Sequence, residues 1–222
     1  MRINAYIARS TGLSRREADN LVETGKVKVG NQTAMNGSKI IDGDKVFIDG
    51  KEIKPLLFEL IMLNKPTGYV VSRRGQGAKT IYELLPTNLR HLKPIGRLDK
   101  NSTGLLLLTN DGKLAQELSH PKYNKTKIYQ VKLNHPLEPV DKHKIENGVM
   151  LDDGLSRLAV SYTSRDRQSL KVVMNEGRNR QIRRTFKAVG YEIQRLHRTN
   201  FGNYALGPLR PGDWQTINKP MD

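Results

Sequence analysis

The sequence contains one carboxylate that is distinguished by the charges beside it. Asp99 lies between Arg97 and Lys100, a few residues before the uncharged apolar run Leu105–Leu108. Such a run, closed by the turn residues 110–112, predicts a fully buried strand. A carboxylate that is flanked by cations at the entry to a buried strand can be held ionised and directed outward. The alternative is an aspartate that makes turn hydrogen bonds, which is the more frequent role of an isolated aspartate in a loop.

A second group of candidate residues is basic and lies further along the chain. If residues 179–189 form a helix, Ile182, Phe186 and Val189 share one apolar face. Four cations then form a stripe on the opposite face: Arg180, Arg183, Arg184 and Lys187. Their mutual repulsion is relieved when an anion lies nearby, so the stripe indicates an anionic partner. A stripe that is merely solvated is the alternative.

Tyr129 is a third candidate because it stands near the start of a predicted strand. Alternation over residues 128–133 places Tyr129, Val131 and Leu133 on the inner face of that strand. A tyrosine in this position usually packs in the core. The alternative is a ring with a functional role.

The composition indicates a basic globular protein. The 222 residues include 38 Lys and Arg against 22 Asp and Glu, a formal net charge of +16, while 36% of the residues are apolar. This combination favours one or two folded domains and a polyanionic partner, nucleic acid before a membrane surface. Residues 1–50 hold eight Lys or Arg against six Asp or Glu, so most of the excess positive charge lies in the second part of the chain.

Several classes of chemistry are excluded or not expected. The absence of cysteine excludes disulfides, thiolate metal sites and a cysteine nucleophile. The five histidines show no paired metal-ligand spacing, and no glycine loop of the phosphate-cradling type is present, so neither a metal nor an organic cofactor is expected. The start of the chain lacks the apolar core of a signal peptide, and no apolar run is long enough to span a membrane. We therefore expect a cytoplasmic protein with no membrane partner.

Local patterns divide the chain into two expected domains, residues 1–54 and 55–222. In the first, helical spacing up to Gly12 predicts one helix, and Ser14 with Glu17 forms a capping box that begins another. An alternating stretch closed by a glycine turn then predicts a small hairpin. In the second domain the patterns predict strands at 57–63, 105–108, 128–133, 155–163 and 169–174 and helices at 113–119, 139–148 and 179–189.

The first expected domain also carries candidate RNA contacts. Arg15 and Arg16 stand in the first turn of a predicted helix, where side chains and free N–H groups can both meet phosphates. Lys26 and Lys28 project from one face of the following strand. Solvated surface charges are the alternative, and the small net charge of this domain is compatible with them.

These patterns resemble a known family. Gly96–Asp99 followed by Ser102–Gly112 is similar to the catalytic motif of the RsuA/RluB-type rRNA pseudouridine synthases. Three further segments resemble motifs of that family and follow the same order: Leu63–Gly68, Lys127–Val131 and Gln181–Arg183. Residues 1–54 resemble the S4 RNA-binding fold. The resemblance implies an α+β protein, in which an S4-like α/β domain precedes a pseudouridine synthase domain built on a mainly antiparallel mixed sheet with flanking helices.

The resemblance also implies roles for individual residues. Asp99 matches the residue on which isomerisation of uridine depends in that family. Tyr129 would lie against the target base, Arg183 would pair with Asp99, and Leu196 would pack near the active site. Arg97 would help to hold open the RNA around the flipped nucleotide. The remaining RNA contacts of the second domain would be Arg178, Arg180, Arg184 and Lys187.

The resulting functional expectation is a monomeric, cofactor-independent enzyme that isomerises a specific uridine of ribosomal RNA to pseudouridine. The basic segment 178–184 resembles the large-subunit branch of the family more closely, and the rRNA could be free or part of an assembling subunit. A non-catalytic RNA chaperone or ribosome-assembly factor that uses the same basic surface is the alternative. An RNA methyltransferase would need a cofactor-binding glycine loop after its first strand, and the sequence shows none.

Overall fold

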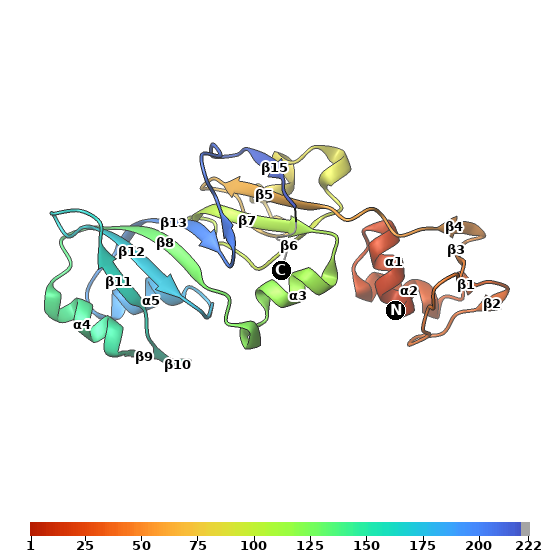
Figure 1. Cartoon of the computed structure of the whole chain (residues 1–222), viewed down its shortest axis with the longest axis horizontal. Helices are drawn as coiled ribbons and strands as arrows, with labels where there is room; N and C mark the ends of the chain where they lie inside the picture. Colours follow the sequence, from red (N-terminus) through yellow and green to blue (C-terminus); the bar gives the residue numbers. More distant parts are fainter. Residues whose placement is uncertain (219–222) are drawn as a thin grey trace.

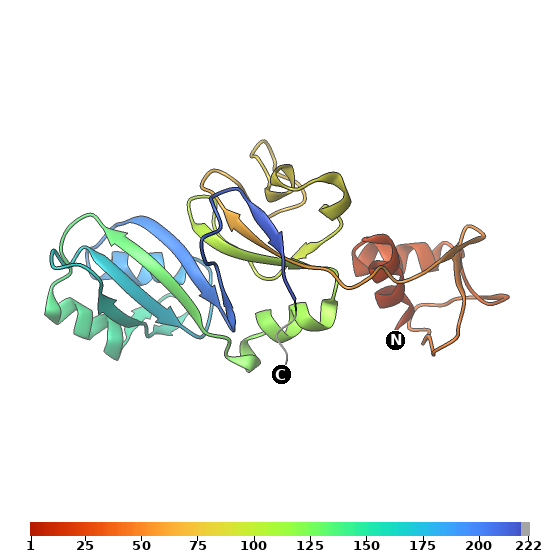
Figure 2. The ribbon, with the colours of Figure 1, turned by 45° about the horizontal axis from the view of Figure 1, so that its top comes forward.

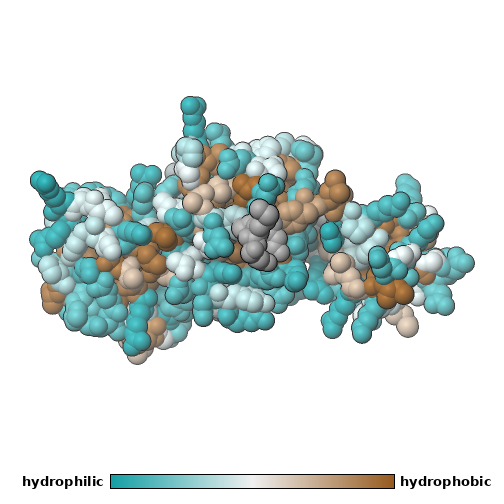
Figure 3. Space-filling view, in the orientation of Figure 1, coloured by the Kyte–Doolittle hydropathy of each residue, from teal (hydrophilic) through white to brown (hydrophobic). Residues whose placement is uncertain are grey.

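The protein is described by a computed structural model that covers residues 1–218. Residues 219–222, the end of the second expected domain, lie outside the described residues. The chain forms an elongated molecule, with the N-terminal helices at one end and strands β11 and β12 near the other (Figures 1 and 2). The face drawn in Figure 3 is mostly hydrophilic, and its apolar patches are separated from one another. Within residues 1–218, every helix is too short or too polar to cross a membrane.

The N-terminal part consists of two helices and a four-stranded sheet of order β2-β1-β3-β4. Its elements are α1 (Ile3–Thr11), α2 (Arg15–Glu23), β1 (Val27–Val29), β2 (Gln32–Thr33), β3 (Val46–Ile48) and β4 (Lys51–Ile53). The predicted capping box is confirmed, because the Ser14 hydroxyl accepts a hydrogen bond from the N–H of Glu17 and the Glu17 carboxylate accepts one from the N–H of Ser14. Helix α1 ends at Gly12, whose φ of 77° favours glycine. These elements enclose a hydrophobic core of their own around Ile3 and Ile7.

The rest of the chain is built on one sheet of order β11-β12-β8-β13-β7-β5-β15. Its strands are β5 (Leu60–Lys65), β7 (Thr103–Thr109), β8 (Lys127–Leu133), β11 (Ala159–Tyr162), β12 (Ser169–Met174), β13 (Ile193–Phe201) and β15 (Trp214–Thr216), with β6 (Lys93–Pro94) beside β7 and β14 (Tyr204–Ala205) beside β13. Every described pairing in it is antiparallel except that of β7 with β13. The prediction of a mainly antiparallel mixed sheet is therefore confirmed.

Helices cover both faces of this sheet. Helix α3 (Gly112–Ser119) packs Leu114 and Leu118 onto one face, where they join the core formed by alternate residues of β5 and β7. Helices α4 (Pro139–Asn147) and α5 (Gln181–Ala188) bury Ile145, Ile182 and Phe186 in a larger core on the other face. Three short 3₁₀ helices, η1 (Ile81–Leu84), η2 (Thr87–Leu89) and η3 (Pro121–Tyr123), lie in the connections.

Two strand predictions differ from the structure. Residues 155–163 do not form one strand, because β10 (Gly154–Ser156) pairs with β9 (Val149–Leu151), whereas β11 pairs with β12. Between β10 and β11 the chain changes partner, and Leu158 is buried at that point. The first strand of the large sheet begins at Leu60 rather than at Leu57, a residue that is 88% exposed.

The two halves of the large sheet meet at a short parallel junction. Strands β7 and β13 are in register only at His197 with Thr103 and at Arg198 with Gly104. Gly104 has a φ of 103°, and a Cβ at this position would lie 2.2 Å from the backbone oxygen of Arg198. Only glycine therefore allows the two strands to approach this closely. Two halves of the sheet are visible on either side of the junction in Figure 2.

Candidate active site

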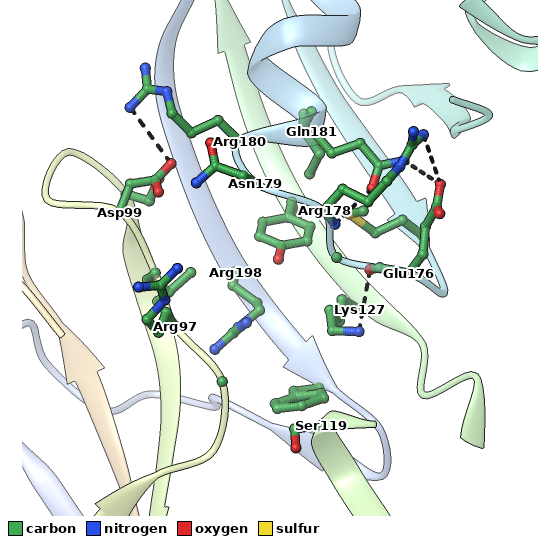
Figure 4. A pocket seen from close by; sticks show the side chains of 18 of the residues that line it. Arg97, Asp99, Ser119, Lys127, Glu176, Arg178, Asn179, Arg180, Gln181 and Arg198 are labelled. Carbon is green, nitrogen blue, oxygen red and sulfur yellow. Dashed lines mark hydrogen bonds and ion pairs between the residues drawn. The ribbon is translucent and has the colours of Figure 1, made fainter. Parts of the chain in front are cut away.

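A cavity of about 460 Å³ lies beside the β7–β13 junction. Most of its lining comes from five segments of the chain: residues 96–99 before β7, residues 118–120 at the end of α3, the inward-facing side chains of β8, residues 174–183 from β12 into α5, and the inward-facing side chains of β13. The close view in Figure 4 shows Asp99, Arg97, Lys127 and Arg198 around one common space. A pocket of this volume has the size of a small-ligand site.

Asp99 occupies the rim of this pocket, on the loop that leads into β7. Its backbone oxygen accepts a hydrogen bond from the N–H of Ser102 at 3.0 Å, which closes a tight turn. Its side chain is 32% exposed, and Oδ2 lies 3.8 Å from Nη1 of Arg180. The carboxylate is thus accessible and has a cation beside it, as the flanking charges indicated. Its ion-pair partner, however, comes from the segment before α5 rather than from the neighbouring Arg97 or Lys100.

The expectation that Arg183 pairs with Asp99 is corrected by the structure, which places Arg180 there. Arg180 precedes α5 in a left-handed conformation with a φ of 46°, and from there its side chain reaches Asp99 (Figure 4). Arg183 lies inside α5 and donates to the backbone oxygens of Ile193 at 3.0 Å and of Asn101 at 3.1 Å. Burial and the nearby Arg180 lower the pKa of Arg183, and Asp99 opposes this effect. Arg183 therefore ties α5 and β13 to the loop of Asp99 and acts on that carboxylate through its field.

Tyr129 and Leu196 both line the pocket from the strands beneath it. On β8, the residues Tyr129, Val131 and Leu133 are buried, as the alternation predicted. Across the β8–β13 ladder, Tyr129 is in register with Arg198, and Val131 is in register with Leu196. The structure thus brings the predicted aromatic and apolar residues to the same cavity as Asp99.

The cationic stripe predicted on α5 is partly neutralised within the protein, because Arg184, one of its four members, pairs with a carboxylate of another segment. Arg178 and Arg184 both pair with Asp153, at 2.8 Å to Oδ1 and 2.6 Å to Oδ2. The hydrogen bond from Arg184 and the field of Arg178 lower the pKa of Asp153. Because Asp153 stands on the turn between β9 and β10, the sequence of the stripe itself could not reveal this partner. Arg97 and Lys187 are both exposed, and of these two Arg97 is the one that lines the pocket.

The predicted RNA contacts of the N-terminal part lie apart from this cavity. These are Arg15, Arg16, Lys26 and Lys28. All four are exposed, and they belong to the end of the molecule that carries α1 and α2 (Figure 1). Arg15 donates a hydrogen bond to Oδ1 of Asn4 at 3.0 Å. The pocket therefore excludes the predicted residues of the first part, and of those in the second part it leaves out Arg184 and Lys187. The others all line it: Arg97, Asp99, Tyr129, Arg178, Arg180, Arg183 and Leu196.

Lys65 is a buried cation that the sequence motif 63–68 did not identify as part of the site. Its Nζ donates to the backbone oxygens of Ser102 at 2.8 Å, Pro66 at 3.0 Å and Lys100 at 3.3 Å. Burial lowers the pKa of Lys65 to about 8, although Asp99 opposes this shift. Lys65 thus fixes the backbone on the C-terminal side of Asp99. A charged residue inside an apolar strand was the sequence signal that could have identified Lys65 as part of the site.

Two further cations of the pocket, Lys127 and Arg198, were also missed. Lys127 stands two positions before Tyr129 on β8, and Arg198 two positions after Leu196 on β13. Side chains two positions apart on a strand share a face. The same alternation that turned Tyr129 inward could therefore have placed Lys127 and Arg198 in the site.

Comparison with known proteins gives this arrangement a family. The family model described as RNA pseudouridylate synthase matches residues 59–188. An uncharacterized RNA pseudouridine synthase of Aquifex aeolicus is 35% identical over 99% of this chain and 91% of its own length. The ribosomal large subunit pseudouridine synthase B of Bacillus subtilis is also 35% identical, over 96% of this chain and 90% of its own length.

A solved structure supports the same assignment. A crystal structure of a pseudouridylate synthase superimposes with a TM-score of 0.70 at 28% identity and covers 98% of this chain and 96% of its own. The chain belongs to the RNA pseudouridylate synthase family. It is accordingly an RNA pseudouridine synthase, an isomerase, and nothing in the comparisons favours a non-catalytic RNA chaperone.

Proposed function

We propose that the enzyme converts a specific uridine of ribosomal RNA to pseudouridine, with Asp99 as the essential carboxylate. One observation carries this proposal: an accessible carboxylate, an aromatic residue and several cations line a single cavity of nucleotide size. The relatives that are named as large-subunit synthases favour large-subunit rRNA as the substrate.

The reaction needs three events, and the pocket residues can support each. The target base first leaves its stack, and the ring of Tyr129 replaces the lost stacking. The carboxylate of Asp99 then promotes cleavage of the bond between C1′ and N1, and the detached uracil turns within the cavity. Finally C5 is joined to C1′ and loses its proton, while N1, released from C1′, takes up a proton. Leu196 supplies an apolar wall that excludes water from the turning base.

The cations around Asp99 compensate its charge, hold its loop and contact the RNA. Arg180 lies beside the carboxylate and compensates its charge. Arg183 and Lys65 hold the backbone of the same loop through hydrogen bonds to its carbonyl groups. Arg97, exposed at the rim, is placed to occupy the gap that the flipped nucleotide leaves in the RNA.

We also propose that residues 1–54 form an S4-like domain that binds rRNA next to the target and that residues 55–222 form the catalytic domain. The separate core of the N-terminal part supports this division. Exposed cations at the start of α2, just before β1 and within β1 would meet RNA phosphates there. Separately from this domain, Arg178, Arg184 and Lys187 would contact RNA from the start of α5 and along it.

We further propose that the enzyme works as a monomer in the cytoplasm, where rRNA is made and ribosomes assemble. The dispersed apolar patches on the face in Figure 3 support a single chain. Light scattering of the purified enzyme that gave the mass of two chains would contradict the monomer, and fractionation of cells would test the location.

The function is tested with unmodified rRNA transcripts that carry tritium at C5 of uridine, incubated with the enzyme and no added cofactor. Isomerisation releases tritium, because C5 exchanges its hydrogen for the bond to C1′. We expect release from large-subunit rRNA and none from small-subunit rRNA. The reverse preference would contradict the substrate assignment. Absence of release from both transcripts and from partly assembled subunits would contradict the function.

A further inference from the structure

Arg198 is the most buried of the cations that line the pocket, with 2% of its surface exposed. Its Nε donates to the backbone oxygen of Leu105 at 2.8 Å. Its Nη2 is buried and has no hydrogen-bond partner among the described residues. In Figure 4 the guanidinium points into the pocket, in the space between Arg97 and Lys127. A buried guanidinium of this kind is stabilised when a ligand accepts its remaining hydrogen bonds.

Lys127 is the immediate cationic neighbour of Arg198. Nζ of Lys127 lies 5.3 Å and Cζ of Arg198 lies 4.9 Å from the centroid of the same ring, that of Phe201. Burial and the charge of Arg198 lower the pKa of Lys127, and Glu176 opposes this shift. Two cations packed on one ring repel each other, so an anion between them would be bound strongly.

The carboxylates that line the pocket interact with residues other than Lys127 and Arg198. The carboxylate of Glu176 accepts hydrogen bonds from Arg178 and Gln181. That of Asp99 pairs with Arg180. Within the part of the chain that the structure describes, neither Lys127 nor Arg198 has a carboxylate within ion-pair distance. Nζ of Lys127 donates to the backbone oxygens of Lys125 at 3.1 Å and Glu176 at 3.3 Å, which leaves one N–H for a ligand. These carbonyl groups do not balance the charge of the pair, so that charge is available to an anion outside the protein.

We propose that Arg198 and Lys127 form a binding site for one phosphodiester group of the RNA, next to the nucleotide that enters the pocket. A phosphodiester carries one negative charge and two acceptor oxygens, which match the paired N–H groups of a guanidinium and an adjacent ammonium. A uracil carbonyl would accept a hydrogen bond but would bring no charge to relieve the repulsion between the cations. Every flipped nucleotide, in contrast, carries a phosphate on each side.

The site acts on the RNA backbone rather than on the base. Arg198 is in register with Tyr129 across the β8–β13 ladder, so a phosphate held there lies on the backbone of the same nucleotide whose base the pocket receives. The phosphate site thus fixes the RNA backbone while the uracil detaches and turns. Because this contact is made equally before and during the reaction, it lowers KM and leaves kcat nearly unchanged. This inference rests on the proposed function.

The experiment compares Arg198→Met, Lys127→Met and the charge-conserving Arg198→Lys with the wild type. Lys171→Met is the matched control, because Lys171 is exposed on β12 and lies outside the lining of the pocket. The probe is the C5-tritiated large-subunit rRNA transcript, with binding measured by filter retention over a series of KCl concentrations. Tritium release at one KCl concentration gives kcat and KM, and thermal unfolding reports whether each variant is folded.

We expect each Met variant to bind about tenfold more weakly, as loss of a charge-assisted hydrogen bond implies. The slope of log K against log salt should become less steep by roughly 0.7 to 0.9, the contribution of one phosphate. Arg198→Lys should recover most of the slope, and Lys171→Met should match the wild type. A slope equal to that of the wild type in both Met variants would overturn the proposal.

Other outcomes are equally decisive. A fall in kcat or in melting temperature with an unchanged slope would show a structural role for Arg198 and overturn the phosphate site. If Arg198→Met does not fold, Lys127→Met alone decides by the same criterion. Wild-type enzyme that binds RNA without releasing tritium would refute the proposed function, while the salt slopes would still test the phosphate site.

Discussion

Two arginines act on the carboxylate of Asp99 in different ways. Arg180 is about half exposed and lies 3.8 Å away, so water screens its attraction to Asp99. Arg183 is partly buried and reaches the same loop by hydrogen bonds to the backbone oxygen of Asn101 and the hydroxyl of Ser102. The position of the Asp99 carboxylate therefore depends mainly on Arg183, and the compensation of its negative charge depends mainly on Arg180.

This division predicts unequal effects of the two substitutions. Arg180→Met should lower kcat/KM by about fivefold or less, the value of an exposed ion pair. Arg183→Met should lower kcat by roughly 10- to 100-fold, because hydrogen bonds from a partly buried charge are lost and the loop of Asp99 shifts. Steady-state tritium release measures both, and circular dichroism confirms folding. Equal losses, or a larger loss for Arg180→Met, would contradict this assignment.

At the scale of the elements, the site depends on the closeness of β7 and β13. Asp99 comes from the loop before β7, while Leu196 and Arg198 come from β13, and the two strands share a register of only two residue pairs. Lys65 on the neighbouring β5 fixes the same loop from the other side. The junction thus sets the distance between the carboxylate and the floor of the pocket.

Gly104→Ala tests this junction. The added Cβ would lie 2.2 Å from the backbone oxygen of Arg198 at a φ of 103°, so the strands must separate. We expect a loss of about 2–4 kcal/mol in the free energy of unfolding, from overpacking and backbone strain. Gly112→Ala is the matched control, because a Cβ there meets no atom within 4 Å. Urea unfolding measures both, and a Gly104→Ala variant as stable as the control would contradict the role of the junction.

The limits of prediction from sequence are clearest among these elements. The capping box of Ser14 and the inward face of β8 are local patterns, and both were predicted. The pairing of Arg180 with Asp99 depends on a left-handed residue before α5, which no periodicity encodes. The neutralisation of Arg184 depends on Asp153 from a distant hairpin. Contacts between segments that are far apart in the chain were therefore the part that sequence reasoning could not supply.

At the scale of the whole molecule, two basic regions stand apart. One surrounds the pocket, and the other consists of the exposed cations Arg15, Arg16, Lys26 and Lys28 in the N-terminal part. Contacts that link the two parts include a hydrogen bond from Nζ of Lys93 to the backbone oxygen of Leu13 at 2.6 Å. A substrate that reaches both regions must be an extended polyanion, as rRNA is.

The N-terminal region should contribute affinity and not chemistry. Substitution by Gln at Arg15, Arg16, Lys26 and Lys28 should raise KM roughly tenfold or more, because several phosphate contacts are lost, and should leave kcat unchanged. Gln at Lys45, Lys51 and Lys54, exposed in the same part of the chain, serves as the control. An unchanged KM in the first variant would show that these four cations are only solvated.

The central claim is that Asp99 carries the isomerisation. The most direct test measures tritium release and rRNA binding in parallel for the wild type, for Asp99→Asn and for the exposed control Asp42→Asn. Asparagine keeps the shape of the side chain and removes its charge. We predict release by the wild type and the control, none by Asp99→Asn, and comparable binding by all three. Release by Asp99→Asn at a rate near that of the wild type would contradict the account.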